Sequence, residues 1–238
     1  MFRQFRQKAK KRLHDYLRQE TELASRDVDL ARQHKAAAES AALIDECMPM
    51  AKSYLDKFAL LRAALAQAEI PGLYCEFGVY QAETINFVAS LIPGEIHGFD
   101  SFKGLPEDWR VGHGKGMFAL PNLPKVRDNV RLYPGWFQDS IPRFMQQHPG
   151  AVAFLHLDAD LYNSTQTVLE CLGDRIVAGT VIQFDEFFNY PGWQEGEYKA
   201  FVEFCAKYRA EPHYFGYTGG GEQVAVKIVK IACLNIEC

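Results

Sequence analysis

Two short apolar runs, each followed by acidic residues, are the clearest feature of the hydrophobic pattern. They cover residues 151–157 and 178–184, are rich in apolar side chains, and precede helix-like segments. Apolar runs of this length predict buried parallel strands. Because ligands of open α/β sheets lie beyond the carboxyl ends of the strands, the acids that follow both runs are predicted to meet in one crevice.

Four carboxylates would share that crevice: Asp158, Asp160, Asp185 and Glu186. Clustered carboxylates repel one another unless a positive charge lies among them. A hard cation with oxygen ligands, such as Mg²⁺, would meet that need. The alternative is that these acids are helix N-caps or solvated turn residues.

The remaining pattern alternates strand-like and helix-like segments. Strands are predicted at 73–78, 95–100, 130–133, 213–218 and 223–229, and helices at 81–91, 162–172 and 195–208. The last two strands are joined by a tight turn of three glycines, which predicts an antiparallel hairpin. The order predicts an α/β fold with a mostly parallel Rossmann-like sheet, helices on both faces and this C-terminal hairpin.

Residues 1–68 show no strand signal and are predicted to form an N-terminal helical extension to a body of residues 69–238. Apolar residues recur at helical spacing over residues 40–68, which indicates a helix packed on the body or on a second subunit. The first 20 residues, with apolar Phe2 and Phe5, are basic. For them, contact with an anionic membrane surface and fraying both remain open. A homo-oligomer is expected.

Composition narrows the class of protein. The chain has 238 residues, of which 48% are hydrophobic and 24% charged, as in soluble globular proteins. A net charge of −4 argues against nucleic acid as the main partner. Six scattered cysteines without a CxxC pair, and no recognisable signal peptide or apolar membrane span, predict a cytoplasmic protein.

The first strand leads into a turn of sequence EFGVYQA, and the second strand ends at Asp100. Asp100 lies 24 residues after Glu76, close to the ~20-residue interval at which a carboxylate meets ribose hydroxyls. The turn has a single glycine, whereas a pyrophosphate needs several for close backbone approach, so NAD and FAD are disfavoured. S-adenosylmethionine has adenosine but no phosphate and would suit the turn, with Glu76 near its amino-acid end. An ordinary turn without a ligand is the alternative.

Two further segments flank the predicted crevice. The loop 101–125 is either a lid or disordered. Trp136 and Phe137 could stack on an adenine or pack in the core. His156 shares a strand face with Asp158 but lies deeper, so it is interpreted as a core or supporting residue rather than a base.

Five segments, in order, resemble the macrocin O-methyltransferase family of class I S-adenosylmethionine-dependent methyltransferases. They read EFGVYQAET, HGFDSFKGLPEDW, LYPGWFQDSIP, LHLDADLYNST and GTVIQFDEF, and the similarity spans residues 73–204. The family includes enzymes that methylate sugars of macrolides and aminocoumarins. The resemblance therefore implies methyl transfer to a hydroxyl of a sugar or another glycosylated small molecule.

The resemblance also implies roles for individual residues. Mg²⁺ would be bound by Asp158, Asp185 and Glu186, and Asp160 would be the general base. S-adenosylmethionine would be bound by Glu76, Gly78, Val79, Tyr80, Asp100, Ser101, Trp136, Asp139 and Asp158.

The chain departs from the family pattern at two places. Gln81 and Ala82 stand where the family usually has two glycines, and Glu186 stands where its metal motif ends in a second aspartate. These departures keep open a non-catalytic scaffold with a degenerate methyltransferase fold. A nicotinamide-dependent oxidoreductase is a third alternative, disfavoured by the missing glycines.

Overall fold

The computed structural model describes residues 2–232, with side chains from residue 6 onward. The strands are β1 Lys52–Tyr54, β2 Leu73–Phe77, β3 Ile96–Asp100, β4 Val130–Pro134, β5 Val152–Leu157, β6 Ile176–Phe184, β7 Glu211–Thr218 and β8 Val224–Lys230. The helices are α1 Phe2–Ala24, α2 Val28–Cys47, α3 Lys57–Gln67, α4 Glu83–Leu91, α5 Phe137–Gln147, α6 Tyr162–Leu172 and α7 Glu197–Tyr208.

One eight-stranded sheet organises the body, in the order β1-β7-β8-β6-β5-β2-β3-β4. Strand β8 runs antiparallel to both of its neighbours, β6 and β7. The other neighbouring pairs are parallel. The predicted fold class, a mostly parallel sheet with a C-terminal antiparallel hairpin, is confirmed.

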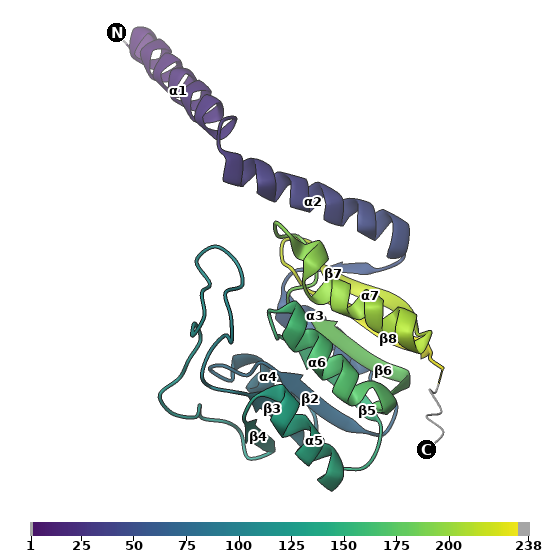
Figure 1. Cartoon of the computed structure of the whole chain (residues 1–238). Coiled ribbons are helices and arrows are strands. Elements are labelled where there is room, and N and C mark those ends of the chain that lie inside the picture. The colour runs from purple at the N-terminus through teal and green to yellow at the C-terminus, as the bar shows by residue number, and fades with distance from the viewer. Residues whose placement is uncertain (1, 233–238) are drawn as a thin grey trace.

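Helices cover both faces of the sheet (Figure 1), and each face has its own apolar core. Leu60 of α3 and Ile85 of α4 belong to the core on one face. Phe144 of α5, Val168 of α6 and Phe201 of α7 belong to the core on the other. Burial on both faces explains why the central strands read as continuous apolar runs rather than as alternating ones.

The N-terminal region differs from the sequence prediction in one respect. Residues 1–68 were expected to contain no strand, but β1 lies at residues 52–54 and pairs in parallel with β7. Its three residues are too few to produce a periodic signal. The following helix, α3, packs against β6, β7 and β8. The placement of a domain boundary at residue 68 stays a prediction.

Helices α1 and α2 form an arm that projects from the body (Figure 1). Every residue from 6 to 35 is exposed, and burial begins at Ala36 of α2. The second half of α2 is attached to the loop after β6, where the Asn189 N–H donates to Ser40 Oγ at 2.9 Å. The predicted apolar positions Phe2 and Phe5 lie outside the described side chains, as do Cys233 and Cys238. No helix within residues 2–232 is long and apolar enough to cross a membrane.

Buried His97 of β3, with the half-buried His148 beside it, predicts that stability depends on pH. The His97 Nδ1 and His148 Nε2 atoms each lie 3.2 Å from the Tyr133 hydroxyl oxygen. Burial, and then the neighbouring His148, lower the pKa of His97 from 6.5 to about 4. In the unfolded chain this imidazole binds a proton below pH 6.5, whereas in the folded chain it stays neutral down to pH 4.

We therefore expect His97 to contribute stability that is complete above pH 6.5 and is lost as the pH falls from 6.5 to 4. A His97→Phe variant lacks this titration. Its free energy of unfolding minus that of the parent should therefore be about 2 kcal/mol larger at pH 4.5 than at pH 7. Urea denaturation of both proteins at a series of pH values measures this difference. Parallel pH profiles would contradict the assignment.

Candidate active site at the carboxyl ends of the strands

The acids of the two apolar runs are brought together because the hydrogen-bond ladder continues past the strand ends. The Asp158 N–H donates to the Phe77 carbonyl oxygen, and the Asp185 N–H donates to the Leu157 carbonyl oxygen, both at 2.8 Å. Asp158 and Asp185 are thereby held at the ends of the neighbouring strands β5 and β6. The sequence prediction that the acids after these strands converge is met by this geometry.

A cavity of about 720 Å³ lies over these strand ends. Its volume is in the range of small-molecule sites. All four predicted acids line it. The other lining residues used below are Lys57, Gly78, Tyr80, Asp100, Ser101, Trp109, Arg110, His113, Phe118, Trp136 and Phe137.

None of the four acids acts as a helix N-cap, which was the alternative reading. Asp185 and Glu186 are 5% and 8% exposed, so they are not solvated turn residues either. Burial, and then repulsion from Asp185, raise the pKa of Asp158. Burial, and then the charges of Asp158 and Asp185, raise the pKa of Glu186 well above its usual value. The cluster therefore favours a cation, which would relieve this repulsion.

Asp160 differs from the other acids in its backbone conformation, and its pKa lies close to neutral. Its φ of +62° lies in the left-handed region, which aspartate and asparagine adopt more readily than most other residues. Burial raises the pKa of Asp160 to about 7, although the nearby Arg110 opposes that rise. A carboxylate with a pKa near the operating pH is suited to general-base work.

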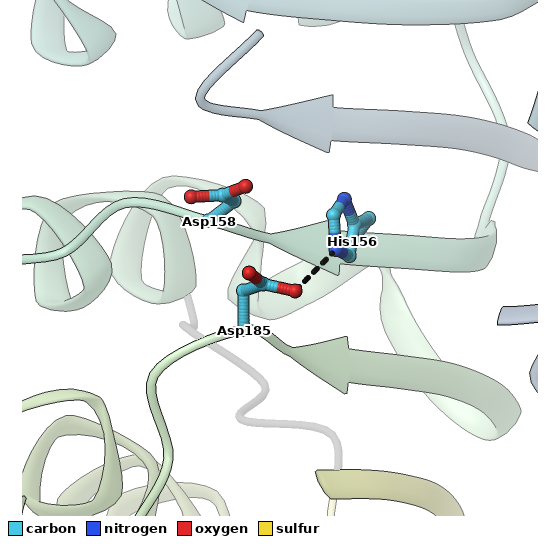
Figure 2. Close-up of side chains that lie close together, drawn as sticks. All are labelled: His156, Asp158 and Asp185. Carbon is cyan, nitrogen blue, oxygen red and sulfur yellow. Dashed lines mark ion pairs between the residues drawn. The ribbon is translucent and has the colours of Figure 1, made fainter. Parts of the chain in front are cut away.

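Asp185 lies between two basic side chains, His156 and Lys57, and Figure 2 shows the first of them. His156 Nε2 lies 3.5 Å from Asp185 Oδ1, and Lys57 Nζ lies 3.8 Å from Asp185 Oδ2. Although burial alone would raise it, the pKa of Asp185 is lowered by His156 and then by Lys57. Burial opposes the charged form of His156, but its contacts with Asp185 and Glu76 raise the pKa of the imidazole to about 10.

The glycine turn after β2 is closed by Asp100. Asp100 Oδ2 accepts from the Val79 N–H at 2.9 Å and from the Tyr80 N–H at 2.8 Å. Gln81 and Ala82 occupy the two positions where the family usually has glycine. Of these two residues, Ala82 has a φ of +64°, a backbone conformation that favours glycine. The departure from the family pattern therefore leaves the path of the turn at Ala82 intact.

The residues predicted to bind S-adenosylmethionine divide into two groups. Gly78, Tyr80, Asp100, Ser101, Trp136 and Asp158 line the cavity. Glu76, Val79 and Asp139 do not: Glu76 and Val79 are buried beneath the turn, and Asp139 is exposed in the first turn of α5. Phe137 also lines the cavity, but its ring packs edge-on against Phe77 of β2.

The loop 101–125 is ordered and contributes one wall of the cavity. Its backbone folds back on itself, since the Leu105 N–H donates to the Met117 carbonyl oxygen at 2.9 Å. Arg110 attaches it to the turn between β7 and β8, donating through Nη1 to Glu222 Oε1 and Oε2 at 3.0 and 2.9 Å. The same guanidinium lies 3.9 Å from the ring centroid of Trp109. The loop is thus held against the cavity, which is the position expected of a lid.

Breaking the contact between Arg110 and Glu222 should loosen this lid. In an Arg110→Gln variant we expect amide hydrogen exchange over residues 105–119 to become about fivefold faster, since a half-buried charged pair with aromatic stacking contributes about 1 kcal/mol. Mass spectrometry of exchanged peptides measures this, with the exchange of β5 as the internal reference. Unchanged exchange in the loop would show that other contacts hold the lid.

Two residues of the site were missed in the sequence. Glu197 of α7 is fully buried, and its Oε1 and Oε2 accept from the Ala159 and Glu186 N–H groups at 3.3 and 3.1 Å. It therefore ties the two acidic loops together. Glutamate in the first turn of a helix is common, so nothing in the sequence distinguished it. Lys57 stood in a segment whose apolar spacing indicated only a packed helix.

The donor atoms of the acidic cluster form two groups that could each hold a divalent cation, and neither group is the predicted set of Asp158, Asp185 and Glu186. Ligand atoms of Asp158, Asp160 and Glu186 lie within 4.8 Å of one another, as do those of His156, Asp158 and Asp185. Glu186 Oε2 is buried and has no hydrogen-bond partner among the described residues, and Asp185 Oδ1 has only the approach of His156 Nε2 at 3.5 Å. Oxygen donors that lack a partner suit a hard ion such as Mg²⁺.

Comparisons with known proteins show which families the chain is similar to. Residues 117–209 match the family described as macrocin-O-methyltransferase (TylF). A tetracenomycin rhamnosyl 4′-O-methyltransferase of Streptomyces olivaceus is 31% identical over 146 residues, covering 50% of this chain and 54% of the relative. The demethyldecarbamoylnovobiocin O-methyltransferase of Streptomyces niveus is 26% identical over 158 residues, covering 55% of this chain and 59% of the relative. The chain thus matches between half and three-fifths of the length of these relatives.

Solved structures support the fold. The calicheamicin methyltransferase CalS11 superposes with a TM-score of 0.57 at 22% identity, covering 83% of this chain and 90% of that one. The O-methyltransferase NovP superposes with a TM-score of 0.53 at 22% identity, covering 72% and 78%. These matches confirm the resemblance to the macrocin O-methyltransferase family over residues 117–209 and show that the chain has the Rossmann-like fold of the class I methyltransferases.

Proposed function

We propose that this protein is an S-adenosylmethionine-dependent O-methyltransferase that acts on a hydroxyl of a sugar or a glycosylated small molecule. The observation that carries the proposal is the single cavity shared by four carboxylates and the Gly78–Asp100 turn. A methyl donor bound at the turn would lie beside the acids that bind and deprotonate an acceptor. Bringing the two reactants together in this way supplies much of the rate acceleration of such a transfer.

The donor half of the cavity lies over β2, β3 and the start of α5. Asp100, at the end of β3, would meet the ribose hydroxyls, and Trp136 would offer an aromatic surface to adenine; both residues line the cavity. The turn presents a single glycine and no array of free backbone N–H groups for a pyrophosphate, because Asp100 already accepts from two of them. This arrangement suits a nucleoside without phosphates better than a dinucleotide.

The acceptor half contains the acids and the lid. Asp158, Asp185 and Glu186 would hold Mg²⁺, which when bound orients adjacent hydroxyls and lowers their pKa. Asp160 accepts the proton of the attacking hydroxyl. His156 is not a candidate base, because it is fully buried and its two nitrogens face Glu76 and Asp185.

The choice of a sugar hydroxyl rests on the relatives and on the cavity wall. The two curated relatives are named for O-methylation of a rhamnosyl tetracenomycin and of a novobiocin precursor. Trp109, His113 and Phe118 of the loop 101–125 add aromatic side chains to the cavity wall. Aromatic faces and carboxylates together suit the apolar faces and hydroxyl groups of a carbohydrate. A cytoplasmic location, a homo-oligomer and membrane contact through residues 1–20 stay predictions.

Calorimetric titration with S-adenosylmethionine, in the presence and absence of Mg²⁺, tests the proposal. We expect saturable binding at one site per chain, followed by transfer of a labelled methyl group to a member of a panel of glycosides. A matched titration with NAD should give no heat. Absence of S-adenosylmethionine binding at millimolar concentrations would refute the proposal.

A further inference from the structure

A buried line of polar side chains runs under the cavity from the cofactor strand to the acidic cluster. Thr84, Glu76, His156 and Asp185 follow one another along it. We propose that Glu76 and His156 are positioning residues: they hold Asp185 in place for a divalent cation, and Glu76 does not touch the methyl donor. This inference rests on the proposed function, and it reverses the role that the sequence resemblance implies for Glu76.

Glu76 is enclosed by protein on all sides. It is 0% exposed and is absent from the cavity wall, although Gly78, two residues later, lines it. Both of its oxygens are engaged, since Oε1 accepts from Thr84 Oγ1 at 3.0 Å and Oε2 lies 2.9 Å from His156 Nδ1. A ligand in the cavity would have to displace one of these contacts to reach the carboxylate.

The contact with His156 follows from strand register. Glu76 of β2 and His156 of β5 are directly paired in the parallel ladder, so their side chains leave the same face of the sheet side by side. His156 is also 0% exposed. Its ring is therefore fixed by the sheet and by Glu76 rather than by any group in the cavity.

The other ring nitrogen of His156 faces the acidic cluster. Figure 2 shows the ring directed at Asp185, with Nε2 3.5 Å from Oδ1. Neither of these two atoms has another hydrogen-bond partner among residues 6–232. Asp185 follows the last residue of β6, so its backbone is fixed, but its side chain needs a neighbour to select one rotamer. His156 Nε2 faces Oδ1, so Oδ2, which lies 3.8 Å from Lys57 Nζ in the cavity wall, is the oxygen left for a cation.

Groups that orient a metal ligand without touching the ion typically change metal affinity by 10–100-fold when they are replaced. The proposal can therefore be separated from a role in cofactor binding by measuring two affinities. Mn²⁺ serves as the probe for the cation, read by electron paramagnetic resonance of the free ion. S-adenosylhomocysteine serves as the probe for the cofactor, read by calorimetry without metal.

Glu76→Gln keeps the shape of the side chain and removes its charge. We expect this variant to weaken Mn²⁺ binding about tenfold or more while S-adenosylhomocysteine affinity stays within about threefold of the parent. Asp100→Asn is the matched comparison, because it alters a carboxylate that does line the donor half. It should show the reverse pattern, with weaker S-adenosylhomocysteine binding and unchanged Mn²⁺ binding.

Several results would contradict the positioning role of Glu76. If Glu76→Gln behaves like Asp100→Asn, or changes neither affinity, the inference is overturned. Should Glu76→Gln fail to fold, Thr84→Val removes only the hydroxyl that donates to Glu76. That variant should weaken Mn²⁺ binding about threefold, and an unchanged Mn²⁺ affinity would overturn the inference equally.

The parent protein separates this inference from the proposed function. A parent that binds S-adenosylhomocysteine but no Mn²⁺ would overturn the positioning role and leave the methyl-donor site standing. A parent that binds neither probe would overturn the proposed function itself.

Discussion

Asp160→Asn is expected to lower the rate of methyl transfer by about 10²–10⁴-fold, the usual contribution of a general base. The substitution should leave the backbone unstrained, because asparagine tolerates the left-handed conformation that Asp160 adopts, with a φ of +62°. The side chain keeps its size but can no longer accept the proton of the acceptor hydroxyl. The measurement is the single-turnover transfer of a labelled methyl group to an accepted glycoside.

The control for this variant is cofactor binding. Asp160 stands on the acceptor side of the cavity, so S-adenosylhomocysteine affinity and the thermal midpoint should match those of the parent. If Asp160→Asn transferred methyl groups within about threefold of the parental rate, another group would have to take the proton.

Gly78→Ala is expected to abolish cofactor binding, with a loss of at least about 100-fold in S-adenosylhomocysteine affinity. Gly78 has a φ of +92°, and a Cβ atom built on it would overlap the carbonyl oxygen of Asp158. The left-handed conformation alone costs about 1–2 kcal/mol for a residue with a side chain. The overlap adds to that cost by pushing apart the ends of β2 and β5, where donor and acids meet. Calorimetry and urea denaturation measure the two effects.

Gly192→Ala separates backbone strain from overlap. Gly192 has the same φ of +92°, but a Cβ atom there meets nothing within 4 Å. This variant should lose only about 1–2 kcal/mol of stability and keep its cofactor affinity. If Gly78→Ala bound S-adenosylhomocysteine as tightly as Gly192→Ala does, the close approach of the turn to Asp158 would have no part in the site.

The sequence predicted the parts of the fold that depend on local pattern. The apolar run at 151–157 matches β5, and the helix predicted at 162–172 matches α6 residue for residue. Acids directly after such strands could be expected to converge, because parallel strands run in the same direction and their carboxyl ends lie at one edge of the sheet. Strand β1 escaped because three residues carry no periodicity and depend on pairing with a distant strand.

The site residues that the sequence did not place correctly depend on contacts between distant segments. Glu76 was expected to bind the cofactor. Its pairing with His156 instead directs its side chain to a buried position beside that imidazole. Lys57 reaches Asp185 from a helix about 130 residues earlier in the chain, and Glu197 reaches back to Ala159 from α7. These contacts are decided by how helices cross the sheet, which a single sequence does not encode in any short pattern.

A crystal structure with S-adenosylhomocysteine and Mn²⁺, read by anomalous scattering, tests the central claim most directly. We expect the adenosine to lie against Trp136 and Asp100, and a Mn²⁺ peak to lie among the carboxylates of Asp158, Asp185 and Glu186. Cofactor density away from the Gly78 turn, or a metal peak remote from these three acids, would contradict it.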